Sequence, residues 1–153
     1  LLEAQEPSDF TVQPERWCGE HLLSEHEMYL GLDREIANSC FDFTRYGVRV
    51  VEEGRKTPRL VWSRENATLE SLIGPDDTDC FSVDRLTLSG GKTTLDAPAG
   101  VCIAASGEGS VTCGDFTHPL KKGDYFFLPA CASSETVLDG TLELLICKGG
   151  KEA

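Results

Sequence analysis

Short apolar stretches with alternating hydrophobic and polar positions fill the chain after Gly47, and turn signals separate them every 8–12 residues. Spacing of this kind is typical of a β-sandwich or barrel. No alternation of strand and helix follows, which disfavours a parallel sheet. The pattern therefore predicts a mainly β fold of the jelly-roll class. The expected strands are 48–52, 58–63, 68–73, 79–88, 92–96, 100–105, 109–113, 116–120, 124–128, 134–138 and 141–147.

Three stretches sharpen this prediction. Residues 100–105, VCIAAS, carry apolar side chains at every second position on both faces, as a strand between two apolar layers would. The alternation within 79–88 changes phase at Asp84-Arg85, which predicts a β-bulge there. Gly114-Asp115 separates two short strands by two residues, which predicts a tight hairpin.

The N-terminal third has a different character. Residues 1–13 predict extended segments broken at Pro7-Ser8-Asp9. Ser24-Glu25-His26-Glu27 is a capping box, so a short helix is expected there, ending near Gly31. Asp33 can cap a second helix that runs to about Phe41. We therefore expect two short helices near the N-terminus.

The charge and cysteine content limit the function classes. The net charge is −12, from 14 Lys and Arg against 26 Asp and Glu, so no nucleic-acid partner is expected. No apolar run is long enough to cross a bilayer, and no secretory signal is visible, so we expect no membrane association. The seven cysteines are odd in number and form no CxxC pair, which favours reduced thiols in a cytoplasmic protein. Leu1 is not Met, which predicts a piece of a longer protein.

Metal ligands and catalytic nucleophiles have no clear pattern. The three histidines, His21, His26 and His118, are scattered, and no HxH motif occurs. We therefore expect no metal site wholly within this chain. There is no GxSxG motif, and the SGGKTT stretch at 89–94 is better explained as a hairpin turn than as a phosphate-binding loop.

The polar residues of the first segment leave two explanations open. Alternation would place Leu1, Glu3 and Gln5 on one face of an extended segment. Such a face belongs either to an exposed edge strand or to a solvated pocket. Composition alone does not separate these alternatives.

Two longer stretches carry a resemblance to a known family. LLEAQEPSDFTVQPER, at 1–16, resembles the segment that directly follows the last zinc-binding histidine of class I mannose-6-phosphate isomerases. GEGSVTCGDFTHPLKKGDYFFLPAC, at 107–131, resembles the second cupin barrel of the same enzymes. In GDYFFLPACASS, Ser134 stands where many cupins have a metal-binding histidine. The resemblance spans nearly the whole chain.

The resemblance implies two cupin barrels, with a zinc-dependent aldose–ketose isomerase site in the first. Residues 1–46 would then be the end of the first, catalytic cupin plus a short helical linker, and 47–153 a second, metal-free barrel. The zinc ligands would lie upstream of Leu1, so this chain itself holds no cofactor and zinc is expected only in the full-length parent.

Three residues match or lie near active-site positions of the family. Glu3 and Asp9 fall on its acidic positions, and Gln13 replaces an arginine. Arg16 is then the candidate to supply the missing positive charge. The resemblance thus implies Glu3, Asp9 and Arg16 as catalytic candidates.

The leading interpretation is the C-terminal part of an enzyme that interconverts mannose 6-phosphate and fructose 6-phosphate, with the fragment alone inactive. Its partner would be the sugar phosphate substrate of the parent. The alternative is a non-catalytic cupin used as a binding or assembly module. In addition, the exposed first strand is expected either to pair with a second chain, which would give a homo-oligomer, or to dock on the second barrel.

Overall fold

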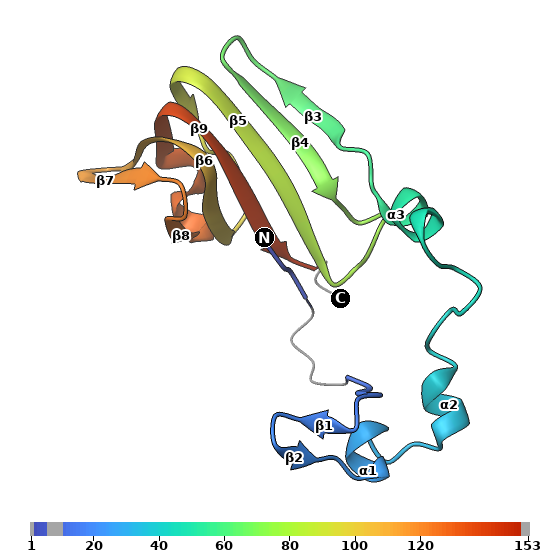
Figure 1. Ribbon diagram of the computed structural model, residues 1–153. Coiled ribbons are helices and arrows are strands. Elements are labelled where there is room, and N and C mark those ends of the chain that lie inside the picture. The colour runs from blue at the N-terminus through green and yellow to red at the C-terminus, as the bar shows by residue number, and fades with distance from the viewer. Residues whose placement is uncertain (1, 6–10, 151–153) are drawn as a thin grey trace. The chain divides into compact units, whose positions relative to one another are not determined.

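The computed structural model describes residues 2–5 and 11–150 and divides into two compact units (Figure 1). One, the sheet unit, contains residues 2–5 and 56–150. The other, the helical unit, contains residues 11–55. Within the described parts of the chain, no helix combines the length and the apolar character that a bilayer crossing needs.

Local capping chemistry forms the first two helices of the helical unit. In the predicted capping box, the Glu27 amide donates to Ser24 Oγ at 3.3 Å, and the Ser24 amide donates to a Glu27 carboxylate oxygen at 2.9 Å. Hydrogen bonds from Ser24 hold the pKa of Glu27 at about 2. Asp33 caps the second helix through the Glu35 amide, at 2.8 Å. The elements are β1 (Trp17–Cys18), β2 (His21–Leu22), α1 (Glu25–Met28), α2 (Arg34–Asn38) and α3 (Val48–Gly54).

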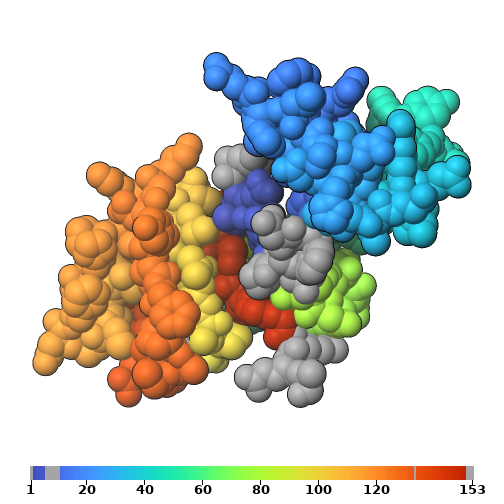
Figure 2. All heavy atoms as spheres, turned by 90° about the horizontal axis from the view of Figure 1, so that it is seen from below, coloured from blue at the N-terminus to red at the C-terminus, as the bar shows by residue number. Residues whose placement is uncertain are grey.

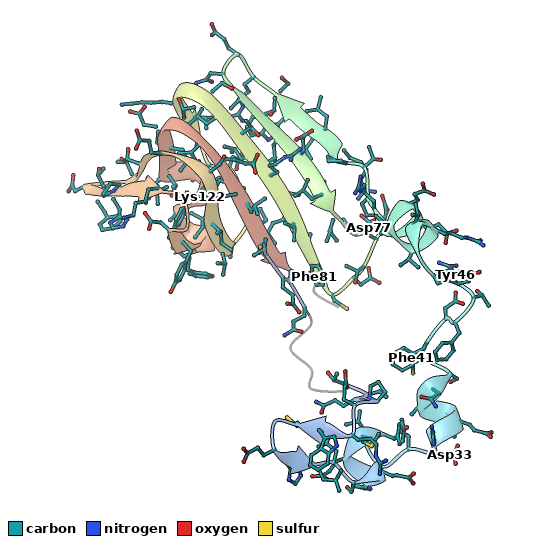
Figure 3. The ribbon with its side chains drawn as sticks, viewed as in Figure 1. Asp33, Phe41, Tyr46, Asp77, Phe81 and Lys122 are labelled. Carbon is teal, nitrogen blue, oxygen red and sulfur yellow. The ribbon has the colours of Figure 1, made fainter. Side chains whose placement is uncertain are left out.

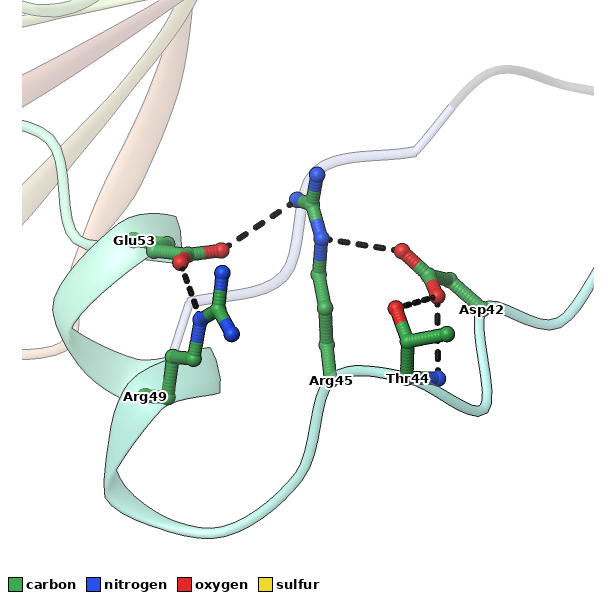
Figure 4. Close-up of polar contacts among 5 residues, drawn as sticks. All are labelled: Asp42, Thr44, Arg45, Arg49 and Glu53. Atoms are coloured by element: carbon green, nitrogen blue, oxygen red, sulfur yellow. Dashed lines mark hydrogen bonds and ion pairs between the residues drawn. The ribbon is translucent and has the colours of Figure 1, made fainter.

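The strand predicted at 48–52 is wrong, because these residues form the helix α3. Their valines are largely exposed, so the alternating pattern serves no buried face. The sequence holds instead a helical i,i+4 ion pair, with Arg49 Nε 2.6 Å from Glu53 Oε1. Arg45 extends the pair to Asp42, at 2.9 Å (Figure 4).

The second predicted helix also differs from the structure, because α2 ends at Asn38 and not near Phe41. The Ser39 hydroxyl donates to the Ile36 carbonyl at 2.7 Å. Such a bond between a side chain and the backbone competes with continuation of the helix.

The sheet unit is antiparallel throughout, with strand order β3-β4-β5-β9-β6-β7 and with β8 paired to β6. The mainly β prediction is confirmed. The two-residue hairpin at Gly114-Asp115 is also confirmed, since Cys113 pairs with Phe116. The elements are β3 (Arg59–Ser63), β4 (Ala67–Ile73), β5 (Phe81–Thr94), β6 (Gly100–Cys113), β7 (Phe116–Lys121), β8 (Tyr125–Leu128), the 3-10 helix η1 (Ala130–Glu135) and β9 (Thr136–Gly149).

Glycines bend three long strands where sequence predicted turns between shorter ones. Residues 79–88 and 92–96 belong largely to one strand, β5, whose register with β9 shifts between Ser89 and Lys92, at Gly90-Gly91. In the same way β6 and β9 each run for 14 residues (Figure 1). The bulge predicted at Asp84-Arg85 is displaced, because the extra residue lies opposite, on β4 between Ser71 and Ile73.

The core lies between the curved halves of this sheet. Leu86, Leu144 and Ala104 are neighbours across β5, β9 and β6 and point to the same, inner face. The inner face is almost wholly apolar. Its other buried members are Ala67, Leu69, Leu88, Leu95, Ala97, Cys102, Val111, Leu120, Leu128, Leu138, Leu142 and Ile146.

Candidate functional site

The three sequence-predicted catalytic residues fall in different parts of the chain. Asp9 lies outside the described residues. Glu3 is exposed and belongs to the sheet unit, whereas Arg16 is exposed and belongs to the helical unit. The catalytic roles of all three remain predictions.

Arg16 lines a cleft inside the helical unit. The Leu23 amide donates to the Arg16 carbonyl at 2.9 Å, which fixes the backbone just before β1. The Gln13 amide donates to the Met28 carbonyl at 2.9 Å, so Gln13 is held by its backbone next to α1. The cleft has a volume of about 430 Å³ and also contains Arg34, which sequence reasoning had not singled out.

Ser134 lies in η1, at the place where the resemblance to cupins suggests a ligand histidine. Pro129 precedes this 3-10 helix, and the buried Thr136 follows it. The Thr136 hydroxyl donates to the Ala132 carbonyl at 2.7 Å, which ties the end of η1 back to its middle. The loop is therefore fixed by its own hydrogen bond and by the apolar core behind it.

The described residues do not fit a zinc ion. Among residues 2–5 and 11–150, no three His, Cys, Asp or Glu side chains gather in a ligand geometry. His21 contacts Glu27, with 3.4 Å between Nε2 and Oε1, and His118 stacks on Phe116. A zinc site needs at least three such donors around one point.

Charged groups at the inner face are paired. Asp84, only 7% exposed, lies across from Ile146 in the sheet and accepts a hydrogen bond from Lys148 Nζ at 2.5 Å. On the opposite face, Arg85 donates to Glu70 at 2.7 Å, and this hydrogen bond raises the pKa of Arg85. These pairs satisfy charges at partly buried positions and so stabilise the sheet.

Asp77 secures the edge of the sheet (Figure 3). Its carboxylate accepts a hydrogen bond from the Gly74 amide at 3.0 Å and contacts Arg59 of β3 at 2.7 Å and Lys56 at 3.1 Å. These interactions, the Gly74 amide first, lower the pKa of Asp77 to about 2.

An apolar groove, which we call the aromatic groove, lies along β7, β8 and η1. Phe116, Tyr125 and Phe127 line it and are each more than half exposed. Its volume is about 480 Å³. Figure 2 shows the orange segments β7 and β8 beside the yellow strand β6, with which both pair. The sequence signal for this groove is the run of aromatic residues in DYFFL, at 124–128.

The cysteines differ strongly in exposure, which yields a test of the core. Cys102 is fully buried, and burial raises its pKa to about 12, whereas Cys131 is exposed. We expect a disulfide reagent at about pH 8 to modify Cys131 rapidly and Cys102 only after unfolding, since the thiolate is the reactive form. Peptide mass spectrometry after timed labelling measures the modification rates of both cysteines. Rapid labelling of Cys102 in the folded protein would contradict the described core.

The same pKa has a consequence for stability. In the unfolded chain the Cys102 thiol loses its proton near pH 9.0, well before the folded protein does. The unfolded state therefore binds fewer protons above this pH, and the contribution of Cys102 to stability falls between about pH 9 and pH 12.

Comparisons with known proteins agree with this architecture. Residues 75–148 match the family model described as mannose-6-phosphate isomerase, cupin domain. No curated protein matches the sequence. A cupin-2 domain protein from Rhodospirillum rubrum shares 14% identity at a TM-score of 0.50, over 63% of this chain and 72% of its own. An RmlC-like cupin from Shewanella frigidimarina shares 15% identity at a TM-score of 0.50, over 63% and 86%. These two show the fold.

A mannose 6-phosphate isomerase from Bacillus subtilis is also similar, with 28% identity and a TM-score of 0.49 over 60% of this chain. The matched part spans 28% of the length of that isomerase. The family match covers β5 to β9, the strands that surround the apolar core. Residues 75–148 are therefore similar to the cupin domain of mannose-6-phosphate isomerases, and the sheet unit has a cupin fold.

Proposed function

We propose that this chain is the C-terminal part of an isomerase that interconverts mannose 6-phosphate and fructose 6-phosphate. Residues 1–46 would complete the catalytic cupin and connect it to the second barrel, residues 47–153. The match of residues 75–148 to the isomerase cupin family supports this proposal. The parent enzyme would act in carbohydrate metabolism in the cytoplasm, with a sugar phosphate as its partner and no nucleic acid.

The observation that carries the proposal is the filling of the cupin interior. Moving a proton between two carbon atoms requires an acid–base group, and a metal or a hydrogen-bond donor must polarise the carbonyl. The inner face of this sheet instead carries tightly packed leucines, with Leu86, Leu138 and Leu144 at most 1% exposed. Such packing supports a structural role for this barrel, with the chemistry assigned to the first barrel.

The proposal predicts that the purified chain neither isomerises mannose 6-phosphate nor carries stoichiometric zinc. Isomerase activity is measured by coupled detection of fructose 6-phosphate, and zinc by elemental analysis after exhaustive dialysis. A protein with this chain fused to its upstream region is expected to regain both. About one zinc per chain in the isolated protein, together with activity, would falsify the proposal.

Substitutions in that longer protein test the individual residues. Glu3→Gln and Arg16→Gln are expected to lower kcat/KM, whereas Glu20→Gln, at an exposed position in the turn between β1 and β2, should leave it unchanged. Equal activity of all three variants would remove Glu3 and Arg16 from the proposed site.

A second function, a binding or assembly module without catalysis, is favoured by one observation. The aromatic groove exposes Phe116, Tyr125 and Phe127, and exposed apolar surface of this kind often marks an interaction site. The homo-oligomer expected from pairing of the N-terminal strand would fit the same function. A start codon directly before Leu1 would favour the module, and an upstream QxH pair would favour the isomerase.

A further inference from the structure

The cleft of the helical unit contains two arginine side chains from separate segments. Arg16 precedes β1, and Arg34 is the first residue of α2. Glu25 is the one carboxylate among the lining residues, so the formal charge of the lining is positive in a chain whose net charge is −12. The other lining residues are Pro14, Leu23, Met28 and Tyr29.

Neither arginine has an ion-pair partner among the described residues. This distinguishes them from four other arginines, each of which lies within 3.7 Å of a carboxylate oxygen, namely Arg45, Arg49, Arg59 and Arg85. Glu25 also lines the cleft but forms no ion pair with either guanidinium, so both keep donors free for a ligand. Arg55 and Arg64 also have no ion pair among the described residues, but neither lines this cleft.

Both side chains start from backbone that is held in place. The guanidinium of Arg34 lies 6.0 Å from the ring centroid of Tyr29, which is itself only 5% exposed, so a buried ring supports the charge. The Arg16 carbonyl accepts the Leu23 amide at 2.9 Å. Met28 and Tyr29 also form the small core of the helical unit together with Ala37, which gives the cleft a fixed floor.

The chemistry of the lining selects an oxyanion. The guanidinium group presents its donors in a planar fork that matches the oxygens of a phosphate group. A cleft of about 430 Å³ is large enough for a phosphate with a small organic group attached. We propose that Arg16 and Arg34 form a binding site for the phosphate group of a small phosphorylated metabolite. The site lies within the helical unit and shares Arg16 with the proposed function, but its readout is phosphate binding by the isolated chain and not isomerase activity.

The test follows the side-chain Nε–H signals of ¹⁵N-labelled protein during titration with inorganic phosphate at constant ionic strength. The Arg16 and Arg34 signals are expected to shift together and to saturate. Arg16→Gln and Arg34→Gln should each weaken binding by about tenfold or more, since each removes a charged hydrogen-bond donor. Arg49→Gln is the matched control, because Arg49 is in the same unit but is paired with Glu53, and it should bind as tightly as the unchanged protein.

A conservative variant separates binding from folding. Arg34→Lys keeps the charge and loses the fork, so it should retain the backbone spectrum of the folded unit and weaken phosphate binding by a smaller factor. Glycerol 3-phosphate replaces inorganic phosphate in a second titration. Equal affinity assigns recognition to phosphate alone, and tighter binding shows that the cleft also contacts the organic group.

Two results would overturn the proposal. One is an Arg16→Gln, Arg34→Gln double variant that binds phosphate as tightly as the unchanged protein. The other is a set of small, unsaturated shifts spread over Arg45, Arg49 and the surface lysines, which would reduce the effect to general screening of charge.

Discussion

Replacing Gly107 with alanine is expected to lower the free energy of unfolding by about 4 kcal/mol or more. Gly107 has φ +77°, a conformation that costs an L-residue about 1–2 kcal/mol. An added Cβ would also stand 2.1 Å from the Thr141 carbonyl oxygen on β9. Relief of that overlap must separate β6 from β9 at a point where Gly107 pairs with Leu142. Urea denaturation followed by circular dichroism measures the loss.

The matched control is Gly114→Ala in the hairpin between β6 and β7. Gly114 also has a positive φ, +55°, but its added Cβ would meet nothing within 4 Å. Only the conformational cost remains, about 1–2 kcal/mol. If the two variants lose the same stability, close approach of the two strands is not what requires glycine at 107.

Replacing Leu144 with alanine should cost about 3–4 kcal/mol. Leu144 is 0% exposed and lies between Leu86 on β5 and Ala104 on β6, so its removal leaves a cavity at the middle of the core. The small neighbour Ala104 cannot fill that space. Chemical denaturation again gives the change in unfolding free energy.

Leu145→Ala is the comparison for this cavity. Leu145 is adjacent in sequence but points to the opposite, half-buried face of the sheet, across from Arg85. Removing the Leu145 side chain should lower the free energy of unfolding by roughly 1 kcal/mol, because folding buries less apolar surface on this face of the sheet than at Leu144. A larger effect at Leu145 than at Leu144 would mean that the inner and outer faces have been exchanged.

The sequence predicted those structural features that depend on interactions between residues close together in the chain. The capping box at Ser24 and Glu27 needs only residues within one turn, and so does the cap at Asp33. The hairpin at Gly114 likewise depends on its two loop residues. These features were therefore predictable from sequence alone.

Features that depend on distant partners were not predictable. Gly90 and Gly107 looked like turns, because sequence does not reveal that β9 continues the ladder past both of them. Valines at 48–52 resembled a strand, although no neighbouring strand needs their apolar face. A glycine indicates that the backbone can adopt unusual angles at its position. Whether the strand bends or reverses there depends on the strand that pairs with it.

The residues of the candidate site likewise divide into those that the sequence indicated and those that only the fold brings together. Arg16 was proposed from its place in a family pattern, and the structure adds Arg34 only because a short hairpin and α1 bring the two segments to one cleft. No spacing rule connects these positions. The aromatic groove was missed for a related reason, since its lining comes from β6, β7, β8 and η1 together.

The central position of β9 has a consequence for synthesis. β9 lies between β5 and β6 and pairs with both over most of its length, yet it follows both in the chain. During translation the edges of β5 and β6 that face each other remain unpaired until residues 136–149 leave the ribosome. We therefore expect the nascent chain to expose two long strand edges, which favours pairing with other chains until β9 has been made.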